Sequence, residues 1–72
     1  MTFADYLAKR QARDNPQGDF VRDAREDARM ADMHTWPQLQ AYLYSKRACH
    51  EAIEAGRLVW RSYQQFRKSR NA

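Results

Sequence analysis

The chain has 72 residues, enough for one domain only, so residues 1–72 are expected to fold as a single unit. Its one cysteine excludes an intramolecular disulfide, and neither histidine stands among other ligands at the spacing of a zinc site. Thirteen basic and nine acidic residues give a net charge of +4, and the longest apolar run, Ala41 to Tyr44, is too short to span a membrane.

The first helix is expected over about residues 3–13. Thr2 can cap it, and Asp5, three residues later, lies near the positive end of the helix dipole. Apolar side chains at i, i+3 and i+4 spacing share one face of this helix, namely Phe3, Tyr6 and Leu7. The segment 14–18 contains a proline and a glycine and is expected to end the helix.

The second helix is expected over about residues 19–30. A narrow apolar stripe runs along it, formed by Phe20, Val21, Ala24, Ala28 and Ala31. Asp27 lies at the edge of this stripe and has two interpretations, a carboxylate that faces a ligand or a half-buried acid. The half-buried acid would pair with an arginine or cap the next segment. We favour this structural role because no second acid or histidine stands at catalytic spacing.

The third helix is expected over about residues 36–46. Thr35 with Gln38 has the form of a capping box, and Pro37 lies in the first turn, where its missing N–H costs nothing. The side chains expected to point inward together are Trp36, Leu39, Tyr42 and Leu43.

The fourth helix is expected over about residues 48–67, with a frayed tail at residues 68–72. One broad apolar arc comprises Cys49, Ala52, Ile53, Gly56, Val59, Trp60, Tyr63 and Phe66. Because glycine weakens a helix, Gly56 is expected to admit a bulky partner such as Trp36 or an aromatic residue of the first helix.

Cys49 and His50 do not form a nucleophile–base pair, because adjacent residues on a helix do not face each other. Cys49 is expected to be a buried structural thiol, and His50 is expected to point into solvent. His34 lies in a loop without other candidate metal ligands. The sequence therefore predicts no metal site and no catalytic pair of this kind.

Four fragments together resemble the YozE-like family of small bacterial proteins, which have a SAM-like (sterile alpha motif-like) helical fold. The fragments are Phe3-x-x-Tyr6-Leu7, Phe20 with Asp27 seven residues later, Tyr42-Leu43, and Trp60-x-x-Tyr63. The resemblance implies a compact four-helix bundle, as do the helices predicted above, and it transfers no catalytic residue. Family members tend to be acidic in the last helix, whereas this helix is rich in arginine.

The basic side of the fourth helix is the main candidate for binding. Residues 1–36 have a charge balance of −1 and residues 37–72 a balance of +5, and from Arg57 onward no acidic residue occurs. Arginine forks suit phosphate, and phosphate contacts dominate nucleic-acid affinity. The alternative is a solvated surface whose arginine stems cover apolar neighbours. The candidate contacts are Lys46, Arg47, Arg57, Arg61, Arg67 and Lys68.

Tyr44 falls off the inward side of the third helix, beside Lys46 and Arg47. An exposed aromatic ring next to cations can stack on a base. A single exposed aromatic side chain is also ordinary on a protein surface, and we favour that interpretation.

The sequence thus predicts an all-α, compact four-helix SAM-like bundle that acts as a non-catalytic binding module. The first hypothesis is nucleic-acid or nucleoprotein binding through the basic side of the last helix. The alternative is a protein–protein adaptor or inhibitor that docks on an acidic partner surface. No cofactor, metal or small-molecule substrate is expected, and oligomeric state stays open. A lone thiol and the absence of a signal-peptide pattern predict a cytoplasmic protein that does not enter the membrane.

Overall fold

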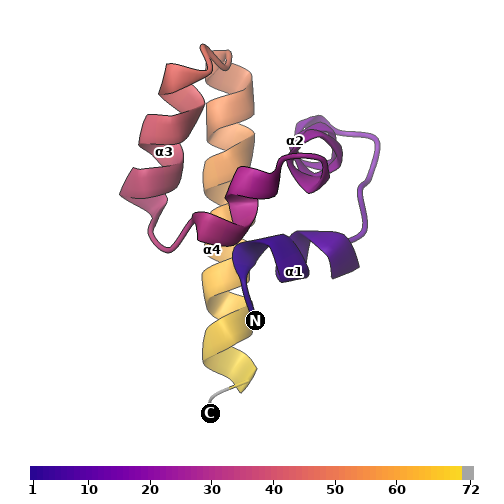
Figure 1. The fold of residues 1–72 in the computed structure, drawn as a ribbon. Helices are drawn as coiled ribbons and strands as arrows, with labels where there is room; N and C mark the ends of the chain where they lie inside the picture. The colour runs from indigo at the N-terminus through magenta and orange to yellow at the C-terminus, as the bar shows by residue number, and fades with distance from the viewer. Residues whose placement is uncertain (71–72) are drawn as a thin grey trace.

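The computed structural model describes residues 1–70, which form four α-helices, one short 3₁₀ helix and no strand (Figure 1). The elements are α1 (Phe3–Lys9), α2 (Pro16–Arg25), η1 (Ala28–Asp32), α3 (Trp36–Ser45) and α4 (His50–Arg70). The predicted all-α bundle of four helices is confirmed. None of the helices in this part of the chain combines the length and the apolar character that crossing a membrane requires.

The longest helix, α4, is the axis on which the other elements pack. In Figure 1, α3 runs beside the first half of α4, α2 lies on the other side of that half, and α1 crosses near its middle. The last turns of α4 extend past the other helices, so the molecule is elongated, with extents of 36 × 26 × 19 Å.

The core is built around an aromatic cluster that joins the two ends of the chain. The Phe3 ring centre lies 4.7 Å from that of Trp60 and 5.2 Å from that of Tyr63, and all three side chains are buried. Such tilted ring pairs add to the free energy gained by removing apolar area from water. The predicted Thr2 cap is present, and the Asp5 side chain completes it as a capping box, which begins α1 where Phe3 can enter this cluster.

α1 ends at Lys9, earlier than the predicted residue 13. Arg25 of α2 donates from Nε to the Leu7 carbonyl oxygen over 2.9 Å and from Nη2 to the Arg10 carbonyl oxygen. The last carbonyl groups of a helix lack a full set of partners within it, and here Arg25 supplies donors, although the Leu7 carbonyl oxygen also accepts the Arg10 N–H over 3.3 Å. The main chain at Arg10 is already extended, with ψ of 136°. A long-range side-chain contact therefore helps to end a helix that its own sequence could have continued.

The second predicted helix, over residues 19–30, is two elements. α2 begins at Pro16 because the Asn15 side chain caps it, accepting the Gly18 N–H over 2.8 Å, and because proline suits the first helical position. After Arg25 the chain turns into η1. Ala28 and Ala31 consequently lie exposed, outside the predicted apolar stripe, and Met30 of η1 is buried in the core.

The two glycines of the chain both permit close packing. A Cβ atom at Gly18 would lie 1.6 Å from the Arg13 carbonyl oxygen, which belongs to the main chain and cannot yield. A Cβ atom at Gly56 would lie 3.0 Å from Phe20 Cε2 and 3.2 Å from Leu43 Cδ1. The expected bulky partner of Gly56 is thus found, but it comes from α2 and α3 and is neither Trp36 nor an aromatic residue of α1.

The α3–α4 connection places a non-glycine residue in the left-handed region. Arg47 has φ of 60°, its N–H donates to the Tyr44 carbonyl oxygen over 3.0 Å, and the Ala48 N–H donates to the Leu43 carbonyl oxygen over 3.0 Å. This is the hydrogen-bond pattern of a Schellman motif, in which glycine is usual at the position that Arg47 occupies.

The boundaries and the apolar arc of the last helix differ from those predicted. α4 begins at His50 and continues as a helix through residues 68–70 of the predicted tail. The rest of that tail, residues 71–72, lies outside the described residues. Good helix formers and the absence of glycine and proline after Gly56 favour this continuation. Cys49 precedes the helix and is exposed, against the prediction of a buried thiol, and Phe66 is 38% exposed because no other helix covers that turn completely.

We predict that Gly18→Ala destabilises the fold by at least about 2 kcal/mol, because a main-chain clash outweighs the gain of about 1 kcal/mol in helix propensity. Gly56→Ala is the matched control. Its new methyl group meets only the Phe20 and Leu43 side chains, which can shift slightly, so its effect should be clearly smaller than that of Gly18→Ala. Urea unfolding followed by circular dichroism measures both, and equal losses would contradict the assignment of Gly18.

We predict that Arg47→Gly stabilises the fold by up to about 1 kcal/mol. A side chain in the left-handed region costs about 1–2 kcal/mol, of which the greater backbone freedom of unfolded glycine cancels a part. Arg47→Ala keeps the strained backbone and should change little. A destabilised Arg47→Gly variant in the same urea titration would mean that the arginine side chain contributes contacts that outweigh the strain.

Candidate nucleic-acid interface

The second half of α4 carries three of the predicted contacts on one side. At about 100° per residue, Arg57, Arg61 and Lys68 fall within about 40° of one another around the helix axis. At about 1.5 Å per residue they extend over about 16 Å of its length. All three side chains are exposed. The stripe predicted from the sequence is therefore a continuous surface of one rigid helix.

The charges on this stripe differ in how far they are neutralised. Arg57 donates to Glu54 Oε2 from Nη2 over 3.0 Å and from Nε over 3.3 Å, and this pairing holds the pKa of Glu54 below its ordinary value. The cations Arg61 and Lys68 form no ion pair within residues 1–70. The charge available to a ligand is thus centred on the part of α4 that follows Arg57.

Arg67 is held on an adjoining side of α4. Its guanidinium carbon lies 5.3 Å from the centre of the Tyr63 ring, a cation–π arrangement that orients the side chain without neutralising it. Tyr63 is buried, and its hydroxyl donates to the Met1 carbonyl oxygen over 3.4 Å. The aromatic core therefore positions a surface cation.

α1 adds cations that the sequence analysis did not include. A small hollow of about 130 Å³ lies between α1 and the end of α4, lined by Met1, Tyr6, Lys9, Arg10 and Phe66. Arg10 donates to the Tyr6 hydroxyl over 2.8 Å, and the Tyr6 and Phe66 ring centres are 5.5 Å apart. No sequence pattern could reveal this grouping, because more than 50 residues separate the two segments.

The remaining predicted contacts lie at the other end of α4. Tyr44 lies in the last turn of α3, and Lys46 and Arg47 lie in the α3–α4 connection. About 27 Å of helix separates the start of α4 from Lys68. Tyr44 is 60% exposed, as predicted. The structure therefore does not unite these three residues with the cations at the end of α4 in one compact patch.

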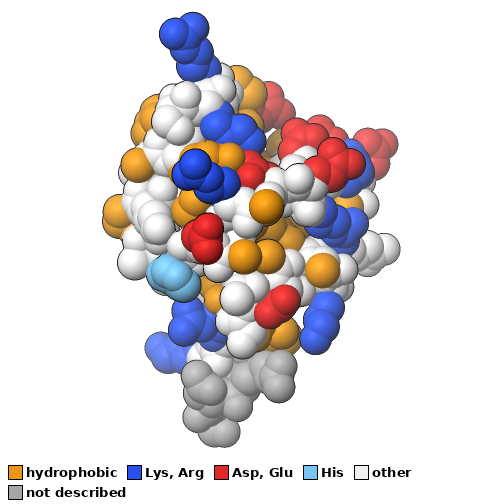
Figure 2. Space-filling model, in the orientation of Figure 1, with side chains coloured by type: hydrophobic (Ala, Val, Ile, Leu, Met, Phe, Trp, Pro, Cys, Tyr) orange, Lys and Arg blue, Asp and Glu red, His pale blue; other side chains and the backbone are white. Residues whose placement is uncertain are grey.

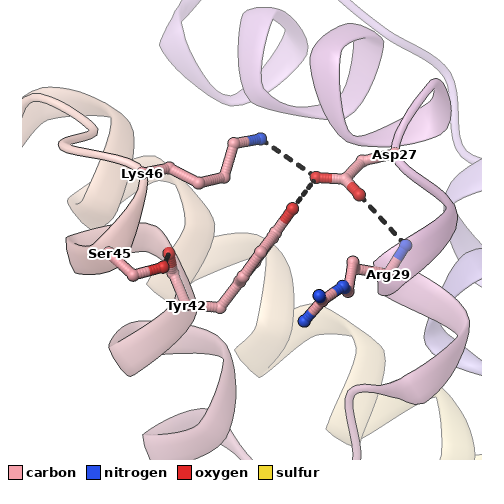
Figure 3. Close-up of polar contacts among 5 residues, drawn as sticks. All are labelled: Asp27, Arg29, Tyr42, Ser45 and Lys46. Atoms are coloured by element: carbon pink, nitrogen blue, oxygen red, sulfur yellow. Dashed lines mark hydrogen bonds and ion pairs between the residues drawn. The ribbon is translucent and has the colours of Figure 1, made fainter.

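Lys46 is also engaged in a different contact, a network around Asp27 that Figure 3 shows. Asp27 Oδ2 accepts from the Tyr42 hydroxyl over 2.5 Å and from Lys46 Nζ over 2.9 Å, and Asp27 Oδ1 accepts the Arg29 N–H over 3.0 Å. The structural role predicted for Asp27 is confirmed in part. The carboxylate does cap the next segment, η1, but its charged partner is a lysine and not an arginine.

The network keeps Asp27 ionised. Burial by itself raises the pKa of Asp27, but the hydrogen bonds from Tyr42, Lys46 and the Arg29 N–H together outweigh it and hold the pKa below its ordinary value. The same contacts raise the pKa of Lys46 and of Tyr42, chiefly through the hydrogen bond to Asp27. The Asp27 side chain is only 14% exposed, so water screens these hydrogen bonds little. Because they join Asp27, which caps η1, to Tyr42 and Lys46, they tie η1 to α3.

Acidic side chains are concentrated over one part of the surface. In Figure 2 they gather over α2, with Lys and Arg side chains beside them, and further Lys and Arg side chains lie on both sides of the lower part of the molecule. Within residues 1–70, no group of three or more histidine, cysteine or carboxylate side chains comes close enough to hold a metal ion.

No protein-family model matches the chain, and no curated protein and no solved structure matches it. The resemblance to the YozE-like family therefore stays a prediction. The observed all-α bundle agrees with it but does not identify a family, because unrelated proteins share such bundles.

We predict that Asp27→Asn lowers the free energy of unfolding by about 1–2 kcal/mol at pH 7. Because the folded state lowers the pKa of Asp27 from its ordinary value of 3.8, its contribution to stability is complete well above that value and is lost as the pH falls below it through the folded-state pKa. The difference between wild type and Asp27→Asn should shrink over this window in urea titrations. Glu26→Gln, a neighbouring exposed acid, is the control, and a difference independent of pH would exclude the ionised network.

Proposed function

We propose that the protein is a non-catalytic module that binds nucleic acid through the second half of α4. The observation that carries the proposal is the exposed set Arg61, Arg67 and Lys68, on a helix that extends past the bundle and has no carboxylate side chain after Glu54. Each phosphate that such a set neutralises releases condensed counterions, which drives binding. The lone exposed thiol, Cys49, suits a reducing compartment such as the cytoplasm.

The geometry favours contacts with the phosphate backbone. Arg61, Arg67 and Lys68 lie within about 10 Å of one helix and can contact neighbouring phosphates, and two of the three are arginines, whose forked donors match phosphate oxygens. Phe66, 38% exposed and beside Arg10 at the C-cap of α1, offers a ring on which a base of a single strand can stack. We therefore expect binding that depends strongly on salt and weakly on sequence.

The test is fluorescence anisotropy with labelled single-stranded and duplex DNA and RNA across a salt series. Contacts to about three phosphates predict a slope near −3 for the logarithm of the association constant against that of salt concentration. Arg61→Glu with Lys68→Glu should weaken binding by at least about tenfold and bring the slope near −1.

A matched control reverses two exposed arginines elsewhere, Arg13→Glu with Arg29→Glu, which produces the same change in net charge. If both double variants lose affinity equally, net charge alone explains the binding and the α4 surface is excluded. If the wild type binds no nucleic acid even at low salt, an acidic protein surface becomes the leading partner of the same cations.

A further inference from the structure

A second surface, which is acidic where the end of α4 is basic, is a groove bounded by α2, η1 and the start of α4. Its volume is about 460 Å³, within the range of ligand-binding clefts. The floor consists of the buried apolar side chains Phe20, Ala24, Met30 and Leu43. Half-buried Ala48 and Ala52 flank this floor, so a side chain that enters the groove meets apolar atoms on several sides.

The lining of this groove is acidic in a basic protein. It contains four carboxylates and one cation, a formal balance of −3, whereas the whole chain has +4. The cation, Lys46, is held by Asp27, and Asp19 is paired with Arg22. Asp23 of α2 and Glu51 of α4 form no ion pair within residues 1–70. Two carboxylates from different helices are therefore available beside an apolar floor.

We propose that this groove binds a basic amphipathic segment of a partner protein. One or two apolar side chains of the segment occupy the floor, and flanking lysines or arginines reach Asp23 and Glu51. The carboxylates of the lining repel a nucleic-acid strand and an acidic peptide, so the charge favours a basic partner over either of these. The mode is that of an amphipathic helix laid into a groove. It uses none of the α4 cations proposed for nucleic acid, so each proposal can fail alone.

The chain contains its own reporter for this groove. Cys49 is the one thiol of the sequence, it is exposed, and it lies in the lining. An occupant of the groove must slow the reaction of this thiol with a disulfide reagent, whereas a ligand on the second half of α4 leaves it accessible.

The probe is a synthetic peptide of 14 residues in which leucines form one helical stripe and all other positions are lysine. Its control is an isomer of identical composition with the leucines dispersed around the helix. We expect the striped peptide to bind the full chain and to slow Cys49 labelling at least fivefold at saturation. The isomer should bind at least tenfold more weakly. Equal protection by both peptides would mean that charge alone causes the binding, and it would overturn the proposal. The absence of binding by the striped peptide would also overturn it.

Variants locate the contact. Asp23→Lys with Glu51→Gln should weaken the striped peptide at least tenfold, whereas Glu26→Lys with Asp14→Asn makes the same charge change outside the groove and should leave the affinity within twofold. Equal loss in the two double variants would exclude the groove. Thermal unfolding by circular dichroism confirms that each variant is folded.

A third variant tests the floor without altering the charge. Ala52→Phe places a ring in the groove and should abolish the protection of Cys49 by the striped peptide, and unchanged protection would overturn the proposal.

Sedimentation equilibrium of the wild type without peptide completes the experiment. A dimer whose Cys49 is already protected would assign the groove to a second copy of the chain and exclude a basic partner segment.

Discussion

The close packing of α2 and α3 on the first half of α4 is the constraint on which the rest of the structure depends. Gly56 has no Cβ, so the Phe20 ring and the Leu43 side chain reach the helix backbone from two other helices. Both helices are thereby committed to the same half of α4. The second half is left to α1 and its aromatic residues, and much of its circumference stays exposed (Figure 1).

This division separates two chemical surfaces. Where α2 meets the start of α4, carboxylates surround an apolar groove, and where α4 extends past the bundle, cations lie on an exposed helix. The aromatic core helps to position the second surface, because Tyr63 contacts both Phe3 of the core and the Arg67 guanidinium. A small domain can in this way present surfaces of opposite charge without pairing them with each other.

Asp27 links the turn after α2 to α3 at the edge of the acidic groove. Its carboxylate caps η1 and accepts hydrogen bonds from Tyr42 and Lys46 of α3 and its C-cap, so the turn after α2 cannot move independently of α3. The same contacts withdraw Lys46 from the set of cations available to a polyanion. A residue that the charge pattern assigned to the basic surface is therefore part of a structural network at the edge of the acidic groove.

Local signals in the sequence predicted the number of helices, their order and several of their ends. The Thr2 cap and the inward positions of Val59 and Trp60 depend only on hydrogen bonds and periodicity within one helix, which neighbouring residues determine. The stripe of Arg57, Arg61 and Lys68 was predictable for the same reason, since a single helix fixes their relative positions.

Tertiary structure alone decided the features that depend on distant segments. Arg25 helps to end α1 by bonding its carbonyl groups, and Cys49 is exposed because no element covers the turn before α4. The nearness of Lys9 and Arg10 to Phe66, and the groove with its carboxylates, combine residues from separate helices. Periodicity orients a side chain about its own helix axis, but which helix lies opposite is determined by the packing of the whole chain.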